Sequence, residues 1–199
     1  MYDRGEIMSE EERLTILKWF QGLKQADKIN KLTFHRGDYL LRLDDKTIPI
    51  EIWKIKRRII EKEGLHEYRQ DPSFEDLITL IPNGGVLHPH TDPNSFDGSI
   101  HCRFNIFINV PGVFDTYYGG YLVEAKNGHY VMCRSGIDMH WSSLNKDDDR
   151  IALSFGYLLP MKKIDELYIL PPEAKKTILE PIRGYAKLMN YFHAFYNGA

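Results

Sequence analysis

The stretch Leu87-His88-Pro89-His90-Thr91-Asp92 carries three side chains that commonly bind metal ions within five residues. On an extended strand, residues two positions apart point to the same face, so His90 and Asp92 predict two ligands for one Fe(II) or Zn(II) ion. His88 lies on that face too, and the stretch alone leaves open which histidine binds. We favour His90, because the carboxylate then falls at the required spacing, and we expect His88 to be a neighbour of the ligands.

A third ligand must come from a later part of the chain, and His140 is the best candidate. It follows a turn in the β-like segment Gly136-Ile137-Asp138-Met139-His140-Trp141. Together, His90, Asp92 and His140 would form a facial triad of two histidines and one carboxylate. That arrangement leaves coordination positions open and is typical of non-haem Fe(II) oxygenases. These three residues are therefore the predicted metal ligands and the predicted catalytic centre.

Ten residues after His140, the segment Arg150-Ile151-Ala152-Leu153-Ser154 predicts a site for an anion. On a strand, Arg150 and Ser154 share one face with Ala152. An inward-pointing arginine beside small residues is costly unless it meets an anion. The guanidinium group binds a carboxylate through two parallel hydrogen bonds, and Ser154 would add a third.

Between these motifs, polar and apolar residues alternate along residues 102–109, with Arg103 and Asn105 on the polar face. In a solvent-facing sheet that face would lie outside, and in a barrel it would line the interior. Both interpretations stay open, and the second makes Arg103 and Asn105 candidate contacts for a cosubstrate or substrate.

The region from Phe74 to Pro160 alternates short β-like segments with turn signals, as expected for a sandwich or barrel. Asn127-Gly128 predicts a hairpin turn within it. Helices are expected on either side, the first introduced by a capping box from Ser9 to Glu12. The expected strands cover residues 31–43, 74–81, 85–91, 101–110, 120–125, 129–134, 137–141 and 150–159, and the expected helices cover 10–25, 49–63 and 173–197.

A chain of 199 residues with a net charge of −2 fits one domain with a substantial core and gives no sign of a nucleic-acid surface. We expect N-terminal helices over residues 1–70, a β core over 74–160 and a helical segment over 171–198. No apolar run is long enough to cross a membrane, and the acidic N-terminus is unlike a signal peptide. Cys102 and Cys133 are expected to be buried, reduced thiols. These features predict a cytoplasmic protein.

The ordered set of His90-Thr91-Asp92, His140, and Arg150 with Ser154 resembles the pattern of Fe(II)/2-oxoglutarate-dependent dioxygenases. Residues 102–109 and Gly119-Gly120-Tyr121-Leu122 are similar to the central strands of the prolyl-hydroxylase-like branch. The resemblance covers about residues 74–160. It implies a mainly β fold with flanking helices, namely a double-stranded β-helix or jelly roll.

The resemblance also implies a reaction. Fe(II) would be held by the triad, and 2-oxoglutarate would chelate the metal, with its far carboxylate on Arg150 and Ser154. Reaction with O₂ would release succinate and CO₂ and hydroxylate an unactivated C–H bond of an amino-acid, peptidyl or other small-molecule substrate. Asp92 argues against halogenation, because halogenases of this superfamily carry a small residue at that position.

Other functions remain open from the sequence. A cupin-like metalloenzyme would share the histidines but would not require Arg150, a zinc hydrolase would need a general base that the motifs lack, and a non-catalytic binding module would keep only the barrel. Residues 93–100 and 111–119 are expected to be specificity loops, and Asp97 and Asp115 in them suggest a cationic substrate. The aromatic C-terminal segment is compatible with a homodimer.

Overall fold

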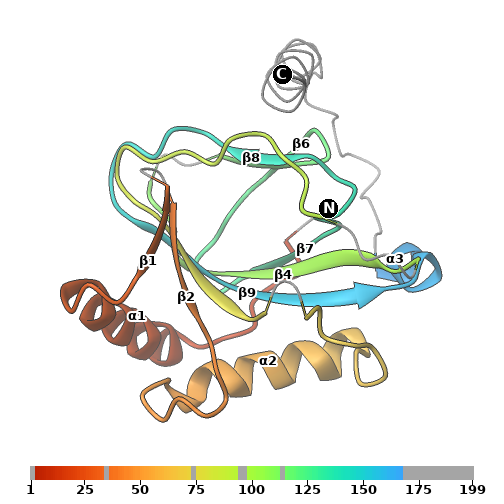
Figure 1. Cartoon of the computed structure of the whole chain (residues 1–199), viewed down its shortest axis with the longest axis horizontal. Helices are drawn as coiled ribbons and strands as arrows, with labels where there is room; N and C mark the ends of the chain where they lie inside the picture. The colour runs from red at the N-terminus through yellow and green to blue at the C-terminus, as the bar shows by residue number, and fades with distance from the viewer. Residues whose placement is uncertain (1–2, 34–35, 73–74, 94–97, 113–114, 168–199) are drawn as a thin grey trace, which may run out of the picture.

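The computed structural model describes residues 3–33, 36–72, 75–93, 98–112 and 115–167 (Figure 1). Nine strands and three helices lie within these residues. The helices are α1 (Glu10–Gln25), α2 (Ile50–Glu63) and α3 (Met161–Leu167). The strands are β1 (Asn30–Thr33), β2 (Arg36–Leu40), β3 (Leu77–Ile81), β4 (Ile100–Asn109), β5 (Thr116–Tyr118), β6 (Tyr121–Val123), β7 (Tyr130–Cys133), β8 (His140–Ser142) and β9 (Arg150–Leu159).

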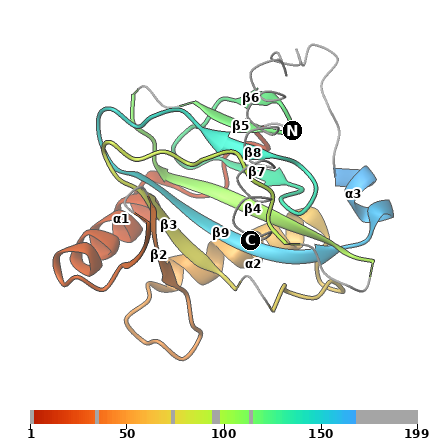
Figure 2. The same ribbon diagram turned by 45° about the horizontal axis from the view of Figure 1, so that its top comes forward.

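The strands form two antiparallel sheets. The larger has the order β1-β2-β3-β9-β4-β7, and the smaller has the order β6-β5-β8. The smaller sheet lies over one face of the larger sheet, and α1 and α2 cover the opposite face (Figures 1 and 2). This mainly β architecture with flanking helices is the predicted one. The large sheet also takes in β1 and β2, which lie outside the expected core of residues 74–160.

Strands β4 and β9 form the middle of the large sheet, and the alternation of their side chains separates two environments. Phe104 and Ile106 of β4, with Leu153 and Phe155 of β9, belong to the core on the helix side. The intervening residues point toward the small sheet, where Phe107 and Ala152 pack with Tyr118, Val123, Val131 and Cys133. Arg103 and Asn105 therefore lie on the inner face, which was one of the two interpretations left open by the sequence.

Helix α1 begins as its sequence predicts. The hydroxyl of Ser9 accepts a hydrogen bond from the backbone N–H of Glu12, and the Glu12 carboxylate accepts one from the N–H of Ser9. Such a capping box satisfies two backbone donors that a helix N-terminus leaves open. Helix α2 ends at Gly64, whose φ of 61° is the left-handed conformation that glycine adopts without strain.

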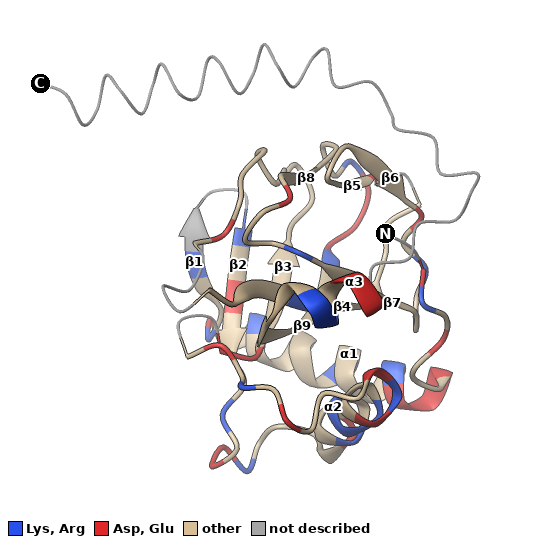
Figure 3. Ribbon diagram, turned by 90° about the vertical axis from the view of Figure 1, so that its right-hand side faces the viewer, with Lys and Arg blue, Asp and Glu red and all other residues tan. Residues whose placement is uncertain are grey.

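Three basic residues of α2 hold the helix to other elements. Figure 3 shows positive and negative residues together on this helix. Lys56 pairs with Asp76 at 2.5 Å, Arg58 pairs with Glu12 of α1, and Lys62 donates to the backbone oxygen of Arg4 at 2.9 Å. These contacts orient the helix beneath the sheet.

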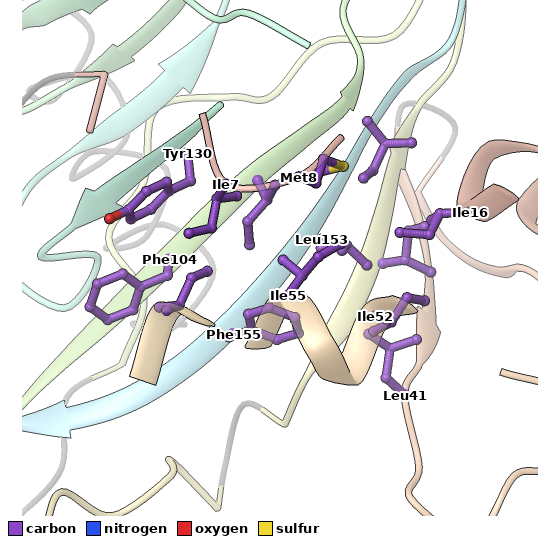
Figure 4. Packing of buried hydrophobic residues seen from close by; sticks show 14 of the residues in the cluster. Ile7, Met8, Ile16, Leu41, Ile52, Ile55, Phe104, Tyr130, Leu153 and Phe155 are labelled. Atoms are coloured by element: carbon purple, nitrogen blue, oxygen red, sulfur yellow. The ribbon is translucent and has the colours of Figure 1, made fainter. Parts of the chain in front are cut away.

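The main hydrophobic core lies between the helices and the large sheet. Ile52 and Ile55 project from α2 toward Leu153 and Phe155 (Figure 4), and all four side chains are fully buried. Burying an aliphatic or aromatic side chain of this size contributes about 1.5–3 kcal/mol. The helix-side core thus gives the sheet a fixed support, and the opposite face of the sheet is free to carry polar residues.

Several local predictions differ from the structure. Asn127-Gly128 does not connect a hairpin, because β6 pairs with β5 and β7 pairs with β4. The hairpin turn is instead Gly119-Gly120, with φ values of 57° and 86°, which suit a tight two-residue turn. Residues 85–91 form a single β-bridge at His90 rather than a strand, and residues 135–137 form a turn.

Cys102 and Cys133 are free and buried, as predicted. Among the described residues, no helix has the length and apolarity needed to cross a membrane. The expected C-terminal helix over residues 173–197, on which the homodimer prediction depended, lies outside the described residues.

Candidate active site

The two predicted histidine ligands face each other across an antiparallel β-bridge. The backbone N–H of His90 donates to the oxygen of His140 at 3.1 Å, and the N–H of His140 donates to the oxygen of His90 at 2.8 Å. Directly opposed residues of an antiparallel pair hold their side chains close together on one face. The two imidazole rings accordingly lie 4.2 Å apart, measured between centroids.

Asp92 completes a group of three side chains that could hold one metal ion. Its backbone N–H donates to the oxygen of Ser135 at 2.8 Å, which fixes the chain just after the bridge. The carboxylate oxygen Oδ1 is 3.7 Å from Nε2 of His90 and 4.0 Å from Nε2 of His140. One ligand atom from each residue lies within 4.8 Å of the others. These are the three residues that the sequence predicted.

Hydrogen bonds at Nδ1 of His90 and His140 leave Nε2 of each ring available to bind a metal ion. Nδ1 of His90 lies 2.7 Å from the backbone oxygen of His88, and Nδ1 of His140 lies 3.2 Å from that of Asp138. A carbonyl oxygen only accepts, so the proton sits on Nδ1 and the lone pair on Nε2. Backbone carbonyls often orient metal-bound histidines in this way. The donor set of two imidazole nitrogens and a carboxylate therefore fits a divalent transition metal.

Local electrostatics keep Asp92 and His140 unprotonated at neutral pH. Burial would raise the pKa of Asp92, but a hydrogen bond from His101 and the charges of His140 and Arg103 lower it to about 2. Burial and the neighbouring His90 lower the pKa of His140 to about 4. Metal ions bind the deprotonated forms of both groups, so neither ligand has to lose a proton at pH 7.

The lowered pKa of His140 should make the stability of the metal-free protein depend on pH. Its ordinary pKa is 6.5, so between about pH 6.5 and 4 the unfolded state binds a proton that the folded state does not. This contribution to stability is complete above pH 6.5 and is lost as the pH falls toward 4, by roughly 3 kcal/mol at most. We expect the Tm of the metal-free protein to fall across this window, and to fall less for His140→Gln. An equal fall in the variant would contradict the assignment.

His101 is completely buried beside the triad. Its Nδ1 donates to the carboxylate of Asp71 at 2.6 Å. Its Nε2 lies 3.3 Å from Nε of Arg103 and 3.4 Å from Oδ2 of Asp92. A neutral His101 accepts from Arg103, and a protonated one would donate to Asp92. In both states the imidazole of His101 bridges Asp71 to Arg103 or to Asp92 itself, and so helps to hold the Asp92 carboxylate in place.

Removing His101 should therefore weaken metal binding without touching a metal ligand. We expect His101→Phe to lower metal affinity by about 10–100-fold, the range found for residues that orient metal ligands. His101→Gln, which can still hydrogen bond, should recover part of the loss. His129→Phe is the matched control, because His129 forms a similar histidine–carboxylate pair with Asp3, 2.7 Å away. Equal losses in His101→Phe and His129→Phe would assign His101 a purely structural role.

A cavity between the two sheets joins the triad to the predicted anion site. Arg150, at the start of β9, is buried, and its Nη1 donates to the hydroxyl of Thr79 at 3.3 Å. Burial lowers its pKa, which the hydroxyl of Tyr118 partly offsets, and Phe107 packs its ring 5.4 Å from the guanidinium. The cavity is lined by Arg36, Thr79, Ile81, Leu87, Asp92, Arg103, Asn105, Tyr118, Ser135, His140, Arg150 and Ser154.

Ser154, four residues after Arg150 on β9, lines the same cavity. It lies opposite Asn105 in the pairing of β4 and β9, and its hydroxyl donates to the Asn105 side-chain oxygen at 2.6 Å. The amide nitrogen of Asn105 donates to the hydroxyl of Tyr118 at 3.0 Å, and Arg103 donates to Ser154 at 3.3 Å. The cavity therefore has a connected polar wall, which bonds Ser154 to Arg103 and Asn105.

The structure thus brings together all seven residues that the sequence singled out: His90, Asp92, His140, Arg150, Ser154, Arg103 and Asn105. It adds His101, Thr79, Tyr118 and Arg36. Tyr118 lies in β5, within a segment expected to be a loop, and its ring stacks on His140 at 5.8 Å between centroids. Of the added residues, only Tyr118 had a signal in the sequence, because it lies in the expected specificity loop of residues 111–119.

No protein-family model matches the chain, and no curated protein matches it in sequence. Solved structures do match. A prolyl hydroxylase from Trichoplax adhaerens, in complex with a hypoxia inducible factor peptide fragment, has a TM-score of 0.61 and 11% identity, covering 83% of this chain and 86% of its own. A prolyl-4-hydroxylase from Pseudomonas putida has a TM-score of 0.58 and 16% identity, covering 79% and 91%.

A third similar structure is HygX from Streptomyces hygroscopicus with nickel and 2-oxoglutarate bound, with a TM-score of 0.56 and 11% identity, covering 77% of this chain and 80% of its own. At these identities the likeness establishes the fold. The chain has the double-stranded β-helix fold of prolyl hydroxylases and 2-oxoglutarate-binding enzymes, as the sequence resemblance implied.

Proposed function

We propose that the protein is an Fe(II)- and 2-oxoglutarate-dependent dioxygenase that hydroxylates an unactivated C–H bond. The observation that carries the proposal is that Asp92 and His140, which form the triad with His90, line one cavity together with the buried Arg150 in this fold. When bound, Fe(II) and 2-oxoglutarate together supply the activation of O₂, with one oxygen atom passing to the substrate as hydroxyl and the other to succinate as CO₂ leaves.

The residues of this chain have separate tasks in that reaction. His90, Asp92 and His140 would bind the metal and leave positions for the cosubstrate and O₂. Arg150 would hold the far carboxylate of 2-oxoglutarate through two hydrogen bonds, with Thr79 beside it. Ser154, Arg103 and Asn105 form the adjoining wall and would contact the cosubstrate or the substrate. Burial of Arg150 supports this role, because a buried guanidinium is stabilised by an anion.

The proposal names the substrate only by broad class. An amino-acid, peptidyl or other small-molecule substrate is consistent with the cavity. The prolyl hydroxylases among the similar structures, one of them solved with a peptide fragment, make a peptidyl substrate a specific candidate.

The test is to load the purified protein with Fe(II) under anaerobic conditions, measure 2-oxoglutarate binding, and then admit O₂ and measure succinate and CO₂. We expect binding with a Kd in the micromolar range typical of enzyme ligands, and slow release of succinate even without substrate. Metal binding without 2-oxoglutarate binding would refute the proposal in favour of a cupin-like metalloenzyme. Absence of both would favour a non-catalytic module.

A further inference from the structure

Arg36, the first residue of β2, lines the cavity together with Asp92 and His140 and has no role in the reaction as described. Its side chain is half-buried. Across the described part of the chain, no hydrogen bond or ion pair holds its guanidinium group. A half-buried cation without a partner is a costly feature, and its cost falls if a bound anion pairs with it.

The charge of Arg36 acts directly on the site. Burial lowers the pKa of Arg103, of His140 and of Arg150, and the positive charge of Arg36 lowers each of the three further. The guanidinium of Arg36 therefore adds a positive electrostatic potential to the cavity.

In and beside the cavity, positive charges outnumber negative charges by one, the charge of Arg36, provided that the proposed function holds. Three buried or mostly buried cations are matched by three buried or mostly buried carboxylates. A divalent metal is matched by the dianion of 2-oxoglutarate. Arg36 alone is left over. The cations are Arg103, Arg150 and Lys56, and the carboxylates are Asp71, Asp76 and Asp92. His101 links Asp71 to Arg103 and Asp92, and Lys56 pairs with Asp76.

We propose that the substrate carries a carboxylate group that pairs with Arg36 at the edge of the cavity. One excess positive charge calls for a monoanion, and the planar guanidinium matches a carboxylate through two hydrogen bonds. This proposal rests on the proposed function and names the substrate class. It replaces the cationic substrate suggested by Asp97 and Asp115, of which Asp97 lies outside the described residues and Asp115 is exposed.

A separate groove lies next to Arg36 on the helix side of the large sheet, where Ile29 and Leu80 belong to the main core. Arg36 also lines this groove, which has a volume of about 690 Å³ and apolar walls from Ile29, Leu80 and Pro82. That volume is in the range of small-molecule sites. Arg36 therefore borders both hollows, and a substrate whose C–H bond reacts at the metal would lie in the metal cavity with its carboxylate toward Arg36.

The experiment compares acids with their uncharged amides. The protein, loaded with Ni(II) and 2-oxoglutarate so that no turnover occurs, is titrated with L-amino acids and short peptides as free acids and as carboxamides. Binding is measured by calorimetry and by the shift in Tm. We expect at least one acid to bind about tenfold or more tightly than its amide, as for a hydrogen-bonded charge pair. Arg36→Gln should remove this preference, and Arg36→Lys should keep part of it.

Lys31→Gln is the matched control, because Lys31 lies on β1, lines the same groove and is exposed, but does not line the metal cavity. It should leave the preference for acids unchanged. The proposal is overturned if, with Ni(II) and 2-oxoglutarate bound, no acid binds more tightly than its amide, or if Arg36→Gln keeps the preference. Failure to bind Ni(II) and 2-oxoglutarate at all is a separate result, which refutes the proposed function together with this inference.

Discussion

Replacing His90 with alanine should abolish metal binding, whereas replacing His88 should leave it intact. The Nε2 atom of His90 faces Asp92 and His140, and its loss leaves only two protein ligands. Metal affinity should fall by more than about 100-fold, which exceeds the effect of removing a residue that only orients a ligand. Succinate release should become undetectable. Both results can be measured by metal titration of the purified variants and by a succinate assay.

His88→Ala is the matched control, since the two histidines are separated only by Pro89. The side chain of His88 is exposed, and its contact with His90 is made by its backbone oxygen, which the substitution keeps. We expect metal affinity to change by no more than about twofold. Strong loss of metal in His88→Ala, with binding retained in His90→Ala, would reverse the assignment of the ligands.

The parts of the fold and site that the sequence predicts are those with a strong local pattern. The alternation in residues 150–159 gives both the strand and the inward direction of Arg150, and the capping box of Ser9 and Glu12 marks the start of α1. The triad belongs to this group as well, because the spacing of His90 and Asp92 limits the choice of the first two ligands. His140 can then act as the third ligand if it lies beside His90, and the β-bridge between the two residues places it there.

The residues that the sequence does not predict depend on contacts between distant parts of the chain. His101 acquires its role from Asp71, which is 30 residues earlier, and nothing near either residue indicates the pair. Arg36 reaches the cavity only because β2 joins the large sheet beside β3, far from the motifs of residues 74–160. Asn127-Gly128 shows the opposite error, since a strong turn signal does not determine which sheet each flanking strand joins.

Replacing Arg150 with methionine should greatly weaken binding of 2-oxoglutarate while leaving the metal site intact. Methionine approximately fills the space of the arginine stem, so the fold should persist. Removing one partner of a buried, hydrogen-bonded charge pair costs about 2–5 kcal/mol, and we expect the Kd for 2-oxoglutarate to rise by about 100-fold or more. Metal affinity should change little, because Arg150 is not one of the three residues that could hold the metal, and it donates a hydrogen bond to Thr79. Titrations with Ni(II) and then with 2-oxoglutarate separate the two affinities.

Two further variants make the result specific. Arg150→Lys keeps the positive charge but loses the paired hydrogen bonds of the guanidinium, so its Kd for 2-oxoglutarate should lie between those of the original protein and Arg150→Met. Arg57→Met removes an exposed arginine of α2 and should change neither affinity. Equal loss of metal and 2-oxoglutarate binding in Arg150→Met would mean that the substitution disturbs the whole cavity, and the role of Arg150 as the carboxylate receptor would then be wrong. Selective loss of 2-oxoglutarate binding would separate this protein from a metalloenzyme that uses the triad alone, because only a dicarboxylate cosubstrate requires a second charge at the far end of the cavity.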